Sequence, residues 1–196
     1  MVATCAAAIG WLIVEKVRDG HATSLGAASG VVAGLVAITP ACGALSPVGS
    51  LILGVVAGGL SALAVGLKYR FGLDDSLDVV GVHLVGGIIG TLLIGVFAVD
   101  TMTGGAEGLL YGGGLAQLGR QLVAVAVVGA YAFTVTYGIA KVLDKVIGLR
   151  AHEDHEHTGL DLTVHAETAY DHGVLGHGAP VGSHPLLSAQ KVKPQE

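Results

Sequence analysis

His83 lies alone in an uncharged run of residues, 79–99, that is long enough to cross a lipid bilayer. A titratable side chain at membrane depth is costly, and it usually marks a pathway for an ion or proton, or a bound ligand. We therefore expect His83 to take part in moving a solute. The residue by itself does not identify the solute.

The composition is that of an integral membrane protein. Of the 196 residues, 52% are hydrophobic and only 13% are charged, and the mean hydropathy is +0.71. Seven of the fifteen acids and seven of the nine histidines follow Gly148. The sequence thus predicts membrane helices over residues 1–147, a cytoplasmic tail over 148–170 and a disordered end over 171–196.

Five apolar segments are candidates for membrane helices, since a span needs about 20 residues. They are residues 1–14, 24–38, 48–67, 77–99 and 121–147. The first is short, and we expect the chain to begin inside that helix. Two prolines, Pro40 and Pro47, favour a turn between the second and third segments. The predicted fold is an all-α membrane protein with five spans.

Basic residues in the short loops predict the orientation, because lysine and arginine accumulate on the cytoplasmic side. They fall in the first loop, in the third loop and at the end of the last span: Lys16, Arg18, Lys68, Arg70, Lys141, Lys145 and Arg150. These three places face the same side of the membrane. We expect a multi-pass protein of the plasma membrane with its C-terminus in the cytoplasm and its N-terminus outside.

Glycines recur at every fourth position inside three of the spans. The rows are Gly26, Gly30 and Gly34; Gly54 and Gly58; and Gly86 and Gly90. Small residues at this spacing let helix backbones approach closely in lipid. Glycine is also more frequent in membrane helices generally, which is the alternative for any single pair. Three rows in three helices favour a packing role.

His83 is expected on one stripe of its helix with Val79, Gly86, Gly87 and Gly90. This stripe contains no carboxylate, so a partner for the imidazole must come from another helix. A helix that starts at Asp74 would place His83 roughly 14 Å along it, near the middle of the hydrocarbon layer. The alternative is a histidine that only hydrogen-bonds a neighbouring helix, and we favour a functional role.

Three acidic residues precede His83. Asp74 and Asp75 are expected to cap free N–H groups at the start of its helix, where the helix dipole also favours negative charge. Asp78 lies one turn deeper and is the better candidate for a specific buried contact. Its partner cannot be identified from the sequence.

Three segments carry a recognisable pattern: AASGVVAGLVAITPACG over 27–43, DDSLDVVGVHLVGGIIG over 74–90 and GLRAHEDHEHTGLDLTVHAETAY over 148–170. Together they resemble the C-terminal half of the ammonium transporters of the Amt/Mep/Rh superfamily. The resemblance implies a trimeric transporter of eleven helices with a pore in each protomer. This chain would correspond to helices seven to eleven. It implies NH4+/NH3 as substrate and the lipid bilayer as setting, with no enzymatic activity, cofactor, metal or nucleic acid.

The resemblance also assigns pore residues. It makes His83 the second of two pore histidines, Thr39 a pore-facing hydroxyl and Val79 a lining residue. Ammonium would lose or relay its proton before crossing a dry apolar constriction, which potassium cannot do. As alternatives, Thr39 caps its helix and Val79 merely packs.

The tail resembles a cytoplasmic extension that docks on the pore mouths and meets PII-type signalling proteins. The matching residues are Gly148, Leu149, Arg150, Gly159, Leu160, Asp161, His165, Glu167 and Tyr170. Between them, His152 and His155 have a spacing compatible with metal binding. A solvated charged segment is the favoured interpretation.

The sequence therefore predicts ammonium transport, with His83 relaying or accepting the proton of NH4+. Taken alone, these residues are expected to conduct nothing, because by resemblance the first histidine and the other pore wall lie on further helices. The main alternative is a non-conducting membrane subunit that binds a PII-type regulator through its tail. A metal transporter that uses His152, His155 and His157 is a third possibility, which the membrane segments do not support.

Overall fold

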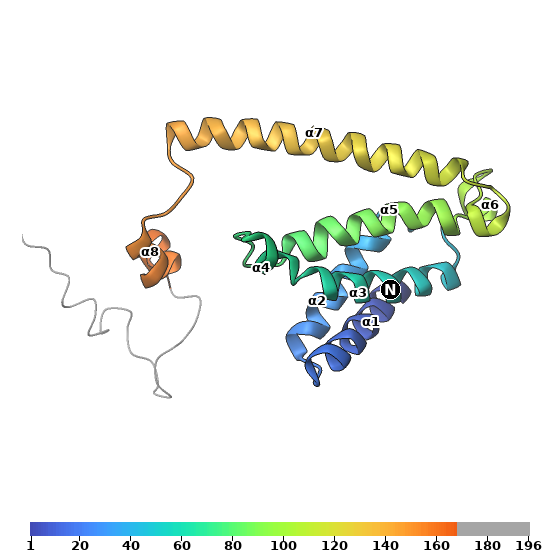
Figure 1. The fold of residues 1–196 in the computed structure, drawn as a ribbon, viewed down its shortest axis with the longest axis horizontal. Coiled ribbons are helices and arrows are strands. Elements are labelled where there is room, and N and C mark those ends of the chain that lie inside the picture. Colours follow the sequence, from blue (N-terminus) through green and yellow to red (C-terminus); the bar gives the residue numbers. More distant parts are fainter. Residues whose placement is uncertain (168–196) are drawn as a thin grey trace, which may run out of the picture. The chain divides into compact units, whose positions relative to one another are not determined.

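The computed structural model describes residues 1–167, and this part is helical without β-strands. Its elements are α1 (Val2–Asp19), α2 (Ser24–Ile38), α3 (Pro47–Ala64), α4 (Leu67–Phe71), the π-helix η1 (Val80–Leu84), α5 (Val85–Phe97), α6 (Asp100–Thr103), the 3₁₀-helix η2 (Leu109–Tyr111), α7 (Ala116–Val146), α8 (Glu153–Thr158) and α9 (Leu160–His165) (Figure 1). The chain divides into two compact units, Met1–Thr136 and a second that begins at Tyr137.

Several helices have the length and apolarity of membrane spans. Among the described residues, Pro47–Phe71, Val80–Phe97 and Ala116–Val146 are long and apolar enough to cross a bilayer, and Ser24–Ile38 is a shorter apolar helix. Helix α7 has no buried residue within the described chain, and an apolar helix that is exposed all round requires lipid or another helix around it. These helices match four of the five predicted segments to within a few residues.

The first helix differs from its prediction. It continues beyond Val14 to Asp19 through four charged residues, Glu15, Lys16, Arg18 and Asp19. Gly20 then ends the helix in the left-handed conformation, with φ 83° and its N–H bonded to the Lys16 carbonyl. Helix geometry therefore persists into the polar loop, where the apolar pattern has already ended.

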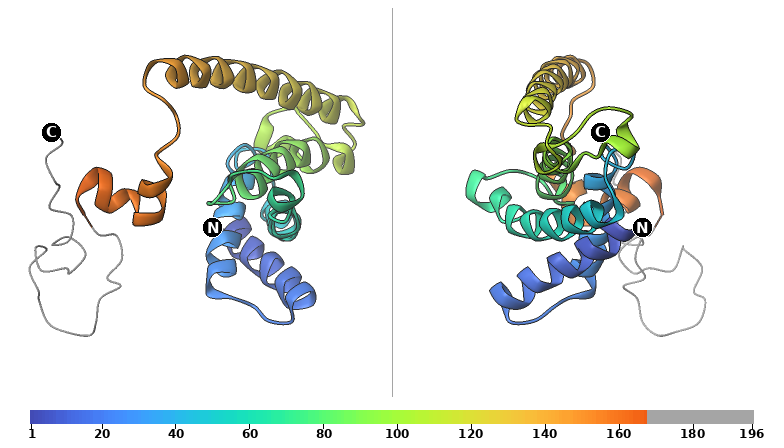
Figure 2. Two further views of the ribbon diagram at one scale, coloured as in Figure 1. Left: turned by 60° about the vertical axis from the view of Figure 1, so that its left-hand side comes forward. Right: turned by 90° about the vertical axis from the view of Figure 1, so that its right-hand side faces the viewer.

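Helix α1 packs against both α2 and α3 (Figure 2). Glycines of both helices face it. A Cβ at Gly34 would lie 2.8 Å from the Thr4 Cα, and one at Gly58 would overlap the Ala7 carbonyl. These contacts join backbone to backbone, which any larger side chain prevents. The predicted packing role of the first two glycine rows is confirmed.

Of the two glycines in the third row, only Gly90 makes a close backbone contact. A Cβ at Gly90 would overlap the Ala37 carbonyl of α2. One at Gly86 would meet the Ser61 Oγ at 3.5 Å, which is ordinary contact. Close approach therefore fixes α5 at Gly90, whereas Gly86 has room for a methyl group.

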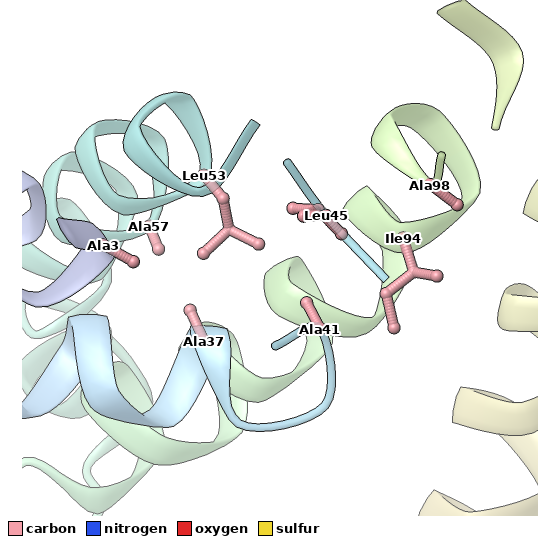
Figure 3. Close-up of a cluster of buried hydrophobic side chains, with 8 residues drawn as sticks. All are labelled: Ala3, Ala37, Ala41, Leu45, Leu53, Ala57, Ile94 and Ala98. Carbon is pink, nitrogen blue, oxygen red and sulfur yellow. The ribbon is translucent and has the colours of Figure 1, made fainter. Parts of the chain in front are cut away.

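The larger core cluster joins four helices and one turn. Its buried side chains, mostly alanine, are Ala3, Ala37, Ala41, Leu45, Leu53, Ala57, Ile94 and Ala98 (Figure 3). The turn between α2 and α3 is held to the end of α5 by a bridge between Leu45 and Ala98, and the Val99 N–H donates to the Ala44 carbonyl at 3.0 Å. The small side chains keep the helix axes close.

Replacing Gly58 by alanine is expected to destabilise the first unit by about 2 kcal/mol, because the new methyl group collides with backbone that cannot move aside. Unfolding of the detergent-solubilised chain by SDS, followed through the fluorescence of the buried Trp11, measures this loss. Gly59→Ala is the matched control, since its Cβ would make only ordinary contacts, with the Val14 Cγ2 at 3.5 Å and the Gly10 carbonyl oxygen at 3.7 Å. Equal unfolding midpoints for the two variants would contradict the packing account.

Candidate functional site

His83 lies on a π-helical turn. Within η1 the Val85 N–H bonds to the Val80 carbonyl, five residues back, instead of the carbonyl four residues back. Single π-turns within α-helices are uncommon and occur frequently at functional sites. Because one residue corresponds to about 100° of an α-helix, the wide turn offsets the faces of the helix on its two sides.

Two neighbours of His83 anchor the turn in the core. Val82 is only 4% exposed and belongs to a buried cluster with Trp11, Ala33 and Ala62. A Cβ at Gly81 would lie 2.8 Å from the Val65 nitrogen, so this residue approaches the backbone after α3 closely. With both residues turned inward, the next side chain, His83, is exposed on the surface of the first unit.

The predicted single stripe from Val79 to Gly90 is therefore wrong. Val79 and His83 are exposed, whereas Gly86 and Gly90 are buried against α2 and α3. The physical reason is the π-turn over Val80–Leu84, which lies between Val79 and the two glycines and shifts the face of the helix that follows it. His83 and Val79 share one exposed surface, four residues apart.

The helix also starts later than predicted. The Asp75 carboxylate accepts hydrogen bonds from the N–H groups of Val79 at 2.7 Å and Val80 at 2.8 Å, and Asp78 has a φ of 57°. The start therefore falls at Val79, not at Asp74, which is exposed. His83 lies four residues from this start, roughly 6 Å along the helix instead of the expected 14 Å.

Asp78 contacts Lys68 of α4. The Lys68 Nζ lies 2.7 Å from the Asp78 Oδ1, and the two side chains are 16% and 28% exposed. The Lys68 Nζ also donates to the Asp75 carbonyl at 3.2 Å. One ammonium group thus holds both ends of the turn that leads into η1.

Thr39 is not brought together with His83. Its hydroxyl donates to the Leu35 carbonyl at 2.6 Å, at the end of α2. Thr39 lies two residues after Ala37, and Ala37 packs on Gly90 of α5. Gly90 is seven residues beyond His83, which corresponds to roughly 10 Å along the helix. Within residues 1–167 the His83 imidazole has no hydrogen-bond partner.

The predicted tail residues lie in the second unit. Gly148 and Gly159 have positive φ values of 78° and 105°. Gly148 follows the end of α7, and Gly159 separates α8 from α9, so each glycine allows the chain to leave helical geometry. The Arg150 Nε lies 3.5 Å from the Glu156 Oε1. Others lie on or next to α9: Leu160, Asp161, His165 and Glu167. Leu149 is exposed, and Tyr170 falls outside the described residues, as does the predicted end at 171–196.

The histidines near α8 form no complete metal site in the described chain. The rings of His152 and His155 are 5.8 Å apart between centroids. The His157 Nε2 lies 3.9 Å from the Glu153 Oε1. Over residues 1–167, no group of three His, Cys, Asp or Glu side chains is placed to hold a metal ion.

The Ammonium Transporter Family matches residues 1–170. The chain belongs to this family. It is 54% identical over 179 residues to an ammonium transporter of Mycobacterium tuberculosis strain H37Rv, covering 88% of this chain and 38% of that protein. An ammonium transporter of Bacillus subtilis is 43% identical over 170 residues, covering 86% of this chain and 42% of that protein.

Solved membrane transporters share the fold. Candida albicans Mep2 superposes with a TM-score of 0.69 at 35% identity, over 79% of this chain and 35% of that chain. A sensor Amt protein gives a TM-score of 0.69 at 28% identity, over 82% of this chain and 39% of that chain. This family member is a multi-pass, all-α membrane protein, and it spans about two fifths of the length of the curated relatives it matches.

The sequence pattern does not single out the residues packed around the start of the His83 helix. Lys68 indicates only the membrane orientation, and the pattern assigns no role to Gly81, Val82 or Trp11. A glycine two residues before the histidine was a usable signal, since it permits close approach. Nothing in the sequence indicated the π-turn.

Asp75→Ala is expected to remove the cap of this helix and to weaken its first turn by about 1 kcal/mol. Hydrogen exchange at the Val79 and Val80 amides should accelerate about fivefold, as measured by mass spectrometry on the chain in micelles. Ser76→Ala, an exposed change in the same turn, should leave the exchange unaltered. Unchanged exchange in Asp75→Ala would show that the cap does not hold the helix start.

Proposed function

We propose that this chain forms one wall of a pathway for ammonium, in which His83 handles the proton. The observation that carries the proposal is an imidazole exposed on a helix with the apolarity of a membrane span, in a chain of the Ammonium Transporter Family. The rest of the pathway would come from residues outside this sequence. Basic residues in the loops support a cytoplasmic position for the tail.

The chemistry follows from the properties of ammonium and imidazole. An intact cation loses most of its hydration in a dry apolar passage, which is prohibitive without compensation. A neutral imidazole has one nitrogen that donates a hydrogen bond and one that accepts a hydrogen bond or a proton. His83 can therefore accept or relay the proton while ammonia crosses. Potassium has no proton to give up and is excluded.

The neighbouring residues refine this proposal. Val79 is 48% exposed on the same surface as His83 and keeps the lining apolar, so that the imidazole is the polar group at that level. The Thr39 hydroxyl already donates to Leu35, so its oxygen is left to accept a hydrogen bond. The Thr39 oxygen can therefore accept a hydrogen bond from an N–H group of ammonium. Thr39 would do so about two helical turns or more away from His83.

A chimaera tests the proposal. In the Mycobacterium tuberculosis relative, the 179 matched residues are replaced by those of this chain, and uptake of methylammonium is measured in cells. We expect saturable uptake from the chimaera and at least a tenfold loss in His83→Ala, because the imidazole proposed to accept the proton of ammonium is then missing.

Val79→Ala is the matched control, since it keeps the lining apolar, and its uptake should stay within about threefold. The 196 residues expressed alone should give no saturable uptake. Robust uptake by His83→Ala chimaeras that reach the membrane in normal amounts would contradict the role of His83. Uptake by the chain alone would contradict the proposal that it forms only one wall.

The tail supports a second function, the binding of a PII-type regulator. Helix α9 exposes apolar side chains, with Leu162 38% and Val164 62% exposed, between acidic and histidine residues. Contiguous exposed apolar side chains rimmed by polar residues can mark a site of protein interaction, and we propose that Leu162 and Val164 form part of such a patch. This function does not require the chain to conduct.

Co-purification of the full chain with a PII-type protein tests the second function. Introducing glutamate at Leu162 and Val164 together should lower the recovered partner at least fivefold, because the charges disrupt an apolar contact. Thr101→Glu, an exposed change on α6, is the control. Equal recovery with all chains, or no recovery with any of them, would contradict the docking role of α9.

A further inference from the structure

We propose that Lys68 is a positioning residue for His83: its ion pair with Asp78 sets the register of the π-turn and thus the direction of the imidazole. The importance of this direction for transport rests on the function proposed above. The positioning itself does not.

The first step is the linkage between the loop and the core. The Lys68 Nζ lies 2.7 Å from the Asp78 Oδ1, and the Asp78 carbonyl accepts the Val82 N–H at 2.8 Å. Val82 is the buried neighbour of His83. A single residue, Asp78, therefore connects the lysine of α4 to the residue that turns His83 outward.

The second step concerns the backbone of Asp78. Its φ of 57° is a conformation that residues other than glycine seldom adopt, and such a conformation persists only where the surroundings enforce it. The partly buried ion pair and the Asp75 cap act on the two sides of this residue. Without the ion pair, we expect Asp78 to relax toward helical φ.

The third step is the consequence for the π-turn. Once Asp78 is helical, the segment before Val85 can form regular α-helix by moving one residue relative to α5. Helix α5 itself is held in place by the close contact of Gly90 with Ala37. The shift would rotate Val82 by roughly 100°, out of its cluster with Trp11, and His83 would turn with it.

Cysteine labelling of the full 196-residue chain in micelles tests this proposal. In a background with Cys5→Ala and Cys42→Ala, single cysteines replace Val82, Leu84 or Leu53, which are 4%, 55% and 0% exposed. The reaction with N-ethylmaleimide is then timed. Without further change, only the cysteine at position 84 should react quickly.

Lys68→Met keeps the length of the side chain and removes its charge. We expect it to raise the labelling rate at position 82 at least tenfold, not to raise that at position 84, which is already exposed and turns with the same segment, and to leave position 53 protected. Lys68→Arg, which preserves the charge, should restore protection at position 82. This combination distinguishes a local rotation from general loosening, which would raise all three rates.

Three results would overturn the proposal. One is continued protection of position 82 in Lys68→Met. Another is labelling of position 53 in that variant, since the ion pair would then hold the whole fold instead of the helix register. The third is a Lys68→Arg chain that behaves like Lys68→Met. Labelling requires no transport, so these outcomes are independent of whether His83 serves ammonium.

Discussion

The burial of Val82 in the cluster formed with Trp11, Ala33 and Ala62 is the interaction on which the position of His83 depends. The cluster exists because α1 approaches α2 and α3 at backbone distance, through glycines that leave no room for side chains. Lipid gives helices no hydrophobic reason to associate, so this close packing supplies the contact that holds them. His83, next to Val82 on a wide turn, is exposed as a result.

The polar end of the helix complements this apolar anchor. Asp75 caps the first turn, and Lys68 joins α4 to Asp78 by a partly buried ion pair. Truncating one partner of such a pair leaves the other uncompensated, so these groups constrain the turn more strongly than an exposed pair would. His83 thus lies between the packed cluster around Val82 and the ion pair of Lys68 with Asp78.

Much of the fold could be predicted from the sequence, because membrane helices follow apolar runs and glycine spacing. The second span, Ser24–Ile38, has its predicted bounds, and the first two glycine rows face α1 as expected. The start of the His83 helix could not be predicted, since it depends on a positive φ at Asp78 and on a partner ten residues away in sequence. The π-turn coincides with the close packing of Gly81 and Val82 on other helices, and these contacts depend on residues distant in sequence.

The proposed pathway requires His83 to face a passage for small amines instead of lipid. The direct measurement uses His83→Cys in the chimaera, without other accessible cysteines, and times its reaction with 2-aminoethyl methanethiosulfonate in membranes. The account predicts that saturating methylammonium slows this reaction at least several-fold, because substrate and reagent share one passage. A reaction rate that methylammonium leaves unchanged, or a thiol that reacts only with lipid-soluble reagents, would contradict it.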